Sequence, residues 1–371
     1  MLNEKIWLVW CFAGPETIDT DYQRVEENFL NARVKKIFLD ALISRVKSKL
    51  DLESTRRVGA FTESVDPGGF IVQNFPDYIF LCGGKKDDFD HALRAHFYDR
   101  IGRLEPNLFK KIQLAEIADD WYQSRKLYDD LLELEEYLAG LSAYILLFLE
   151  SPGAIAELGV FSQSDGLRDK LIVIIEQSYY NQTSFIRNGP IERIRRARIK
   201  SLWIYPWLCE DDGQNPRRVD AAIKDTALDF VIDKLRVSLE EGPKACKFQH
   251  NDHGHRMLLI TDLIKLIGVC SQSEIQTVLR GLGIVIKFRL LTKYLYLLGQ
   301  LGLIYPRPFG NLTYFLARPE NPEYIHYAPK EPNISVDRMK LQLRLSKDIP
   351  SSREKKGVFA AFAREIRRVV P

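Results

Sequence analysis

Short apolar runs, separated by longer helical patterns, organise the first half of the chain. Five of these runs predict β-strands, at residues 6–13, 78–82, 143–149, 171–175 and 202–205. The runs at 143–149 and 171–175 are continuously apolar instead of alternating, which is typical of strands covered by helices on both faces. This succession of strands and helices predicts an α/β fold built on a parallel sheet.

A long and mostly polar segment lies between the second and third predicted strands. It covers residues 85–140 and ends in an amphipathic pattern at residues 129–138. Such a pattern is typical of a helix with one buried face. We expect residues 85–140 to form a largely helical insertion within a first domain that spans residues 1–212.

The pattern changes after the Asp-Asp-Gly-Gln-Asn-Pro linker at residues 211–216. Three helices are predicted at residues 257–267, 272–279 and 287–301. Two short apolar segments, 303–307 and 313–317, follow on either side of a Pro-Phe-Gly-Asn turn and predict a hairpin. Three helices followed by a hairpin is the order of a winged helix-turn-helix domain, which we place at residues 217–328. Residues 329–371 form a basic C-terminal tail.

Composition narrows the class of protein. The 371 residues are 46% hydrophobic and 28% charged, which is typical of a globular chain of two or three domains and excludes a disordered protein. No apolar run approaches the ~18 residues that span a bilayer, so we expect no membrane partner. Five cysteines without a CxxC pair favour reduced thiols in a cytoplasm. The net charge is only +3, but residues 330–371 carry eleven basic against five acidic residues.

The most informative motif, Glu-Ser-Pro-Gly-Ala-Ile-Ala-Glu-Leu-Gly, follows the third predicted strand. Ser151 is in the position of an N-cap, and Pro152 is the first helical residue, where its missing N–H costs nothing. In an open parallel sheet, ligands bind beyond the carboxyl ends of the strands, where a helix N-terminus presents N–H groups to phosphate or ribose oxygens. Gly153 would let a ligand approach the backbone closely.

Glu157 is the only charged residue between Ser151 and Ser164. A carboxylate held there could stabilise or attack the oxocarbenium-like C1′ atom that forms when an N-glycosidic bond breaks, as one carboxylate does in retaining glycoside hydrolases. The alternative interpretation is structural, because acidic residues favour the beginning of helices in any case.

These residues resemble the nucleoside 2-deoxyribosyltransferase-like fold, a Rossmann-like parallel-sheet family. The resemblance implies that the first-strand loop lines the sugar and base site, through Phe12, Ala13, Gly14 and Pro15. It also implies that Glu157 is the nucleophile and that Asp130 contacts the nucleobase, with Asp129 as the less favoured register. The family's transferases usually carry an Asp where this chain has Ser151, which favours hydrolysis over base exchange. Ser151 could still hold a ribose hydroxyl or the catalytic carboxylate.

The combination of this domain with a winged helix resembles the toxic effectors of bacterial retron anti-phage systems. That resemblance implies an N-glycosidase acting on NAD⁺ or a related nucleotide, restrained by a reverse transcriptase and its multicopy single-stranded DNA (msDNA) in a larger, homo-oligomeric assembly. NAD⁺ would be the substrate and no cofactor is expected. Its nicotinamide is already cationic and leaves as a neutral base, so no strong general acid is needed.

Two other functions stay open from the sequence. The chain could be a winged-helix transcription regulator that senses a nucleotide without cleaving it. It could also be a true nucleoside deoxyribosyltransferase, although Ser151 argues against base exchange.

Several further residues are candidates for binding. Gly83 and Gly84 end the second predicted strand and could form a wall of the ligand crevice, or simply a turn. Cys246, His250, His253 and His255 lack the paired spacing of a structural zinc site, and we expect no metal. The winged helix predicts contacts to a phosphate backbone from four basic residues, Lys287, Arg289, Lys293 and Arg307. The basic residues within 193–200 and the tail compete for the same role.

Overall fold

The computed structural model describes residues 58–114, 127–209, 217–242, 245–331, 335–348 and 355–362. The strand expected at residues 6–13, together with Phe12, Ala13, Gly14 and Pro15, lies outside the described residues. No helix in the described ranges is long and apolar enough to cross a membrane.

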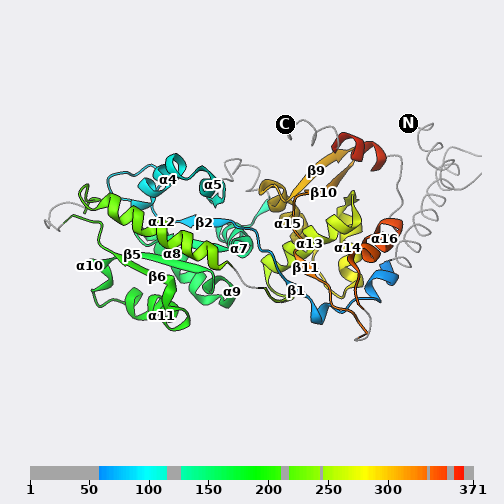
Figure 1. Cartoon of the computed structure of the whole chain (residues 1–371), viewed down its shortest axis with the longest axis horizontal. Coiled ribbons are helices and arrows are strands. Elements are labelled where there is room, and N and C mark those ends of the chain that lie inside the picture. Colours follow the sequence, from blue (N-terminus) through cyan, green and yellow to red (C-terminus); the bar gives the residue numbers. More distant parts are fainter. Residues whose placement is uncertain are drawn as a thin grey trace, which may run out of the picture.

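A parallel sheet of five strands forms the centre of one half of the molecule (Figure 1). In spatial order its strands are β3 (Ile112–Gln113), β2 (Ile79–Cys82), β4 (Tyr144–Phe148), β5 (Leu171–Glu176) and β6 (Leu202–Tyr205). All neighbours run parallel. The predicted α/β class is therefore confirmed, as are four of the predicted strands. The edge strand β3 is additional and comes from the segment predicted as largely helical.

Helices cover both faces of this sheet, which explains why its strands are continuously apolar. Along β4, Tyr144, Leu146 and Phe148 pack with α4 (Leu93–Leu104) and α12 (Lys224–Glu241). Ile145 and Leu147 pack on the opposite face with α7 (Leu131–Leu141) and α8 (Pro152–Gln163). Alternate side chains of a strand point to opposite faces, so every position of β4 is buried. The helix α12, which follows the 211–216 linker, thus packs on the parallel sheet.

Shorter elements complete this half of the molecule. They are α5 (Pro106–Phe109), α9 (Asp165–Arg168), α10 (Gln177–Tyr180), η3 (Arg187–Ile191), α11 (Glu192–Ala197) and η4 (Ile199–Ser201).

The second half contains the three predicted helices and the hairpin. Its elements are α13 (His253–Ile267), β8 (Cys270–Ser271), α14 (Gln272–Gly281), α15 (Phe288–Gln300), β9 (Ile304–Phe309) and β10 (Leu312–Ala317). The three strands form an antiparallel sheet in the order β8-β10-β9. Helix α13 begins four residues earlier than predicted because Asp252 caps it, accepting a hydrogen bond from the His255 N–H.

Segments that precede the parallel sheet in the chain and segments that follow it meet in this second half. Strand β1 (Ile71–Val72), preceded by η1 (Pro67–Gly69), pairs with β7 (Cys246–Lys247) and with β11 (Ile325–His326). Helix α16 (Arg338–Asp348) packs on α13, where Arg338 contacts the fully buried Asp262 through two hydrogen bonds of 3.0 Å.

The two halves meet where α7 crosses α13, near the centre of the molecule (Figure 1). Gly140 and Gly254 allow the two backbones to touch, because a Cβ added to Gly254 would lie 2.1 Å from the Gly140 carbonyl oxygen. Lys170, which precedes β5, donates to the same carbonyl at 2.5 Å. The Tyr78 hydroxyl, just before β2, donates to the Leu301 carbonyl at 2.9 Å. The second half therefore packs against the edge of the sheet where the strands begin.

Candidate active site

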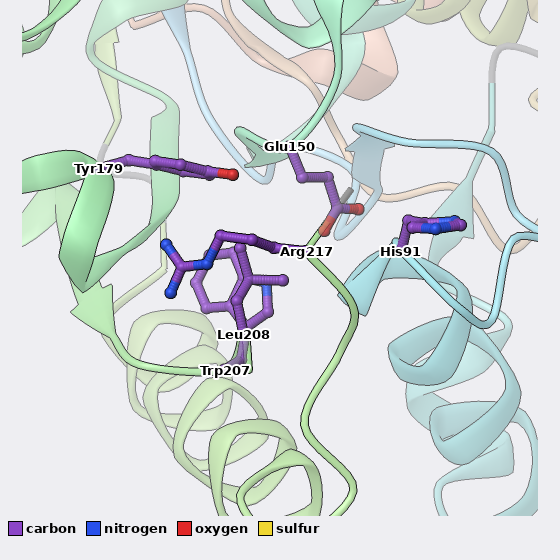
Figure 2. A pocket seen from close by; sticks show the side chains of 6 residues that line it. All are labelled: His91, Glu150, Tyr179, Trp207, Leu208 and Arg217. Carbon is purple, nitrogen blue, oxygen red and sulfur yellow. The ribbon is translucent and has the colours of Figure 1, made fainter. Parts of the chain in front are cut away.

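A cavity of about 350 Å³ opens at the opposite edge, where the parallel strands end (Figure 2). It is lined by His91, Glu150, Tyr179, Trp207, Leu208 and Arg217. Glu150 follows β4, Tyr179 follows β5, and Trp207 follows β6. From β2, the chain adds β3 on one side and then β4, β5 and β6 on the other side, so the sheet has a topological switch point between β2 and β4. Ligands in open α/β sheets bind beyond the carboxyl ends of the strands at such a switch point.

Glu150 is the acid that lines this cavity, and its carboxylate is held by backbone groups. Its Oε2 accepts from the Leu93 N–H at 2.8 Å, and its Oε1 accepts from the N–H groups of Arg94 at 3.1 Å and Gly84 at 3.3 Å. Burial raises the pKa of Glu150 to about 7, against the opposing effect of these donors. Both protonation states of this carboxyl are therefore populated near neutral pH.

The two glycines after β2 fit the space beside Glu150. Gly83 has a φ of +142°, and a Cβ there would lie 2.9 Å from the Phe148 Cβ. A Cβ on Gly84 would lie 3.1 Å from Glu150 Oε1. The buried Arg94 holds this loop by donating to the Gly84 carbonyl at 2.7 Å. Neither glycine lines the cavity itself, but both shape the support of Glu150.

Arg217 enters the cavity from the segment that follows the 211–216 linker. Its Nε donates to the Cys209 carbonyl at 2.9 Å, and its Nη1 donates to Ser178 Oγ at 2.6 Å. The guanidinium lies 5.7 Å from the centre of the Tyr179 ring, which Figure 2 shows at the same side of the cavity. The sequence does not single out Arg217, Tyr179 or Trp207, because they come from three separate segments of the chain: Tyr179 from α10, Trp207 from the segment after β6, and Arg217 from the segment after the linker.

The predicted start of α8 is confirmed. Ser151 is its N-cap and accepts from the Ala154 N–H at 3.1 Å, while Pro152 and Gly153 are exposed. Glu157 lies in the second turn of α8, half-buried, with its Oε2 atom shielded from solvent. It is not among the residues that line the cavity, so its predicted role as nucleophile stays a prediction. Glu150, seven residues earlier, is the acid that sequence reasoning missed.

Asp130, the predicted base contact, is the N-cap of α7 and accepts from the Glu133 N–H at 2.8 Å. It does not line the cavity either.

The four predicted nucleic-acid contacts have different surroundings. Lys293 is buried, with its Nζ 2.6 Å from Glu133 Oε2 and 2.9 Å from Asp129 Oδ2, so its charge is already compensated within the protein. Burial alone would lower the pKa of Lys293, but its hydrogen bonds to Glu133 and Asp129 raise it above the usual value. Arg289 is exposed and pairs with Asp129 at 2.7 Å. Lys287 is exposed, and Arg307 is half-buried in β9.

The cluster of Cys246 and nearby histidines forms pairs instead of a ligand set. Cys246 Sγ lies 3.5 Å from His255 Nε2, and His255 Nδ1 accepts from the Gln249 N–H at 3.0 Å. His253 Nδ1 lies 2.5 Å from the Tyr294 hydroxyl. Within the described ranges, no three His, Cys, Asp or Glu side chains are placed to hold a metal ion.

Two curated relatives from Escherichia coli match parts of the chain. "Retron Ec86 putative ribosyltransferase/DNA-binding protein" is 32% identical over 166 residues, which is 42% of this chain and 48% of the relative. "Retron Ec73 putative ribosyltransferase/DNA-binding protein" is 32% identical over 132 residues, which is 34% of this chain and 41% of the relative. The chain thus spans less than half the length of either relative.

The family model described as "STM3845 retron effector protein" matches residues 90–306. The matched region begins just before α4, includes every residue that lines the cavity, and ends within β9. Because this match covers more than half of the chain, the protein belongs to the STM3845 retron effector family.

Proposed function

We propose that this retron effector is an N-glycosidase that hydrolyses NAD⁺ or a related nucleotide in the cavity at the carboxyl edge of the sheet. The observation that carries the proposal is the position of Glu150, a carboxyl of raised pKa that lines a cavity beside the β2–β4 switch point. The names of the two relatives, which include ribosyltransferase, support chemistry at a ribose C1′ atom.

The proposed reaction breaks the bond between C1′ and the nicotinamide nitrogen. Nicotinamide leaves with the bonding electrons as a neutral base, and positive charge develops at C1′. A carboxylate stabilises this charge. The family resemblance gives this role to Glu157, which lies on α8 outside the lining of the cavity, so the Glu157 variant tests that role separately. A water molecule then adds its oxygen to C1′ and loses a proton. The ionised form of Glu150 is suited to accept that proton, because its pKa lies near the working pH.

The second half of the molecule would attach the effector to its partners, a reverse transcriptase and msDNA. The chain order α13-β8-α14-α15-β9-β10 is that of a winged helix-turn-helix with β9 and β10 as the wing. Lys287, which is exposed, is then a basic residue that would contact phosphates, whereas Lys293 and Arg289 pair with acids on the α7 side. Much of α15 is buried within the protein and is not free to enter a DNA groove. Docking on a partner protein is therefore a further role that we propose for this half.

The test is release of free nicotinamide from NAD⁺ by the full-length protein, alone and after challenge of its retron complex with phage. We expect wild type to release nicotinamide, and Glu150→Gln and Glu157→Gln each to lose about a hundredfold or more in rate. Glu240→Gln, an exposed change on α12, is the matched control. Wild-type binding of NAD⁺ without release of nicotinamide would instead favour a nucleotide-sensing regulator.

A further inference from the structure

Of the helices that begin at the carboxyl edge of the sheet, three have an N–H group of the first turn occupied by a side chain of the protein itself. Ser151 accepts from the first turn of α8, and Glu150 accepts from the first turn of α4. Glu176, at the end of β5, accepts from the Ser178 and Tyr179 N–H groups at the start of α10. These N–H groups are therefore not available to an anionic group in the cavity, and side-chain donors become important.

Arg217 is the strong cationic donor among the residues that line the cavity. Two protein acceptors, the Cys209 carbonyl and Ser178 Oγ, fix its guanidinium. Within the described ranges it forms no ion pair with a carboxylate. Ser178 in turn donates its hydroxyl to Glu176, which is buried. Glu176 at the end of β5 thus holds the Ser178 hydroxyl, and this hydroxyl orients the guanidinium of Arg217. The other N–H groups of the guanidinium are not used by these contacts.

The surroundings of Arg217 also suit a nucleotide. Tyr179 presents a ring that is 41% exposed, and Trp207 is 1% exposed and forms part of the cavity wall. Among the described residues, the Trp207 Nε1 donor is buried without a hydrogen-bond partner.

We infer that Arg217 binds a phosphate group of the substrate, and that this effector acts on phosphorylated nucleotides and discriminates against free nucleosides. Planar guanidinium groups recognise phosphates through paired hydrogen bonds, which an ammonium group cannot reproduce. Tyr179 would stack on the base or ribose beside that phosphate. The inference deepens the proposed function. It rests on that proposal only for the identity of the bond that is cleaved.

Binding is measured separately from catalysis, by calorimetric titration of the full-length protein with AMP, adenosine and inorganic phosphate. We expect AMP to bind at least about tenfold more tightly than adenosine, and Arg217→Met to weaken AMP binding by about ten- to a hundredfold while leaving adenosine unchanged. Arg217→Lys should recover only part of the loss. Arg218→Met, which alters the exposed neighbour, is the matched control, and thermal unfolding verifies that each variant is folded.

Equal affinity of wild type for AMP and adenosine, or unchanged AMP affinity in a folded Arg217→Met variant, would overturn the inference. A base-release assay on NAD⁺, AMP and adenosine separates the two proposals. Release from adenosine as fast as from AMP, unaffected by Arg217→Met, leaves the N-glycosidase and removes the phosphate site. Arg217-dependent binding of AMP with no base release from any of these compounds leaves the phosphate site and removes the N-glycosidase.

Discussion

The Glu150 carboxylate caps helix α4 across a gap of 57 residues in the sequence, its Oε2 atom accepting from the Leu93 N–H at 2.8 Å. The residue in the N-cap position of α4, Ala92, provides no side-chain acceptor. An acid of the candidate site thus also fastens the loop between β2 and α4 to the end of β4. Changes at Glu150 should therefore affect both chemistry and stability.

Glu150→Gln should lower the free energy of unfolding by about 1–3 kcal/mol. The amide keeps one acceptor oxygen but turns an NH₂ group toward backbone N–H donors, so one buried donor loses its partner. Urea denaturation followed by circular dichroism measures the change. Glu240→Gln, on the exposed side of α12, should stay within about 0.5 kcal/mol of wild type. Equal stability of the two variants would contradict the capping role.

Glu150 should also make stability depend on pH. Its pKa is raised from 4.5 to about 7 in the folded protein, so the native state holds this proton more tightly than the unfolded chain. The contribution is fully present below about pH 4.5 and is lost as the pH rises through about 7. Wild type should therefore lose more stability than Glu150→Gln between pH 5 and pH 8, measured as the shift in urea midpoint. An identical shift in both proteins would refute the raised pKa.

Lys293→Met should destabilise the protein by about 3 kcal/mol, because Glu133 would lose its buried cation. Arg289→Met is the matched comparison. Arg289 and Asp129 are 66% and 62% exposed, and exposed pairs contribute at most about 1 kcal/mol. Chemical denaturation of both variants tests the contrast. If the two variants are equally stable, α7 and α15 are not joined through Lys293.

Gly254→Ala should prevent the close crossing of α7 and α13. The added Cβ would meet backbone, the Gly140 carbonyl at 2.1 Å, which no rotamer change can relieve. We expect a loss of several kcal/mol or failure to fold, read from thermal unfolding and soluble yield. Gly159→Ala in α8, where a Cβ would meet nothing within 4 Å, should instead gain about 0.5–1 kcal/mol from helix propensity.

Arg338→Lys tests the attachment of α16 to the second half. Asp262 is fully buried and accepts from the Tyr324 N–H, the Tyr327 hydroxyl and two guanidinium nitrogens of Arg338. A lysine cannot supply the paired donors, so we expect a loss of about 1–3 kcal/mol in denaturation experiments. Glu323→Gln, which removes the exposed partner of the same arginine, should cost much less.

Local patterns predicted most of the described secondary structure. Four continuous or short apolar runs became strands of the parallel sheet because helices bury both of their faces. The start of α8 was predictable from Ser151 and Pro152, since capping depends on adjacent residues alone. Strand β3 was missed because it is two residues long and only Ile112 is buried.

The candidate site was much less predictable. Sequence reasoning placed the chemistry on Glu157 because that acid stands alone in an apolar helix. The cavity instead gathers Glu150, Tyr179 and Arg217, which come from separate segments of the chain and meet only because parallel strands end at a common edge. The burial of Lys293 was equally hidden, since its acidic partners on the α7 side lie about 160 residues away in the chain.

The crossing at Gly140 and Gly254 places the second half of the molecule at the edge of the sheet where strands begin, while the cavity opens where they end. A partner seated only on that half would leave the mouth of the cavity uncovered and could not act as a plug. Restraint from such a partner would have to act through the contacts that join the two halves, among them α7, whose last turn leads into β4 and then to Glu150. Any such restraint would then act on the site from the opposite edge of the sheet.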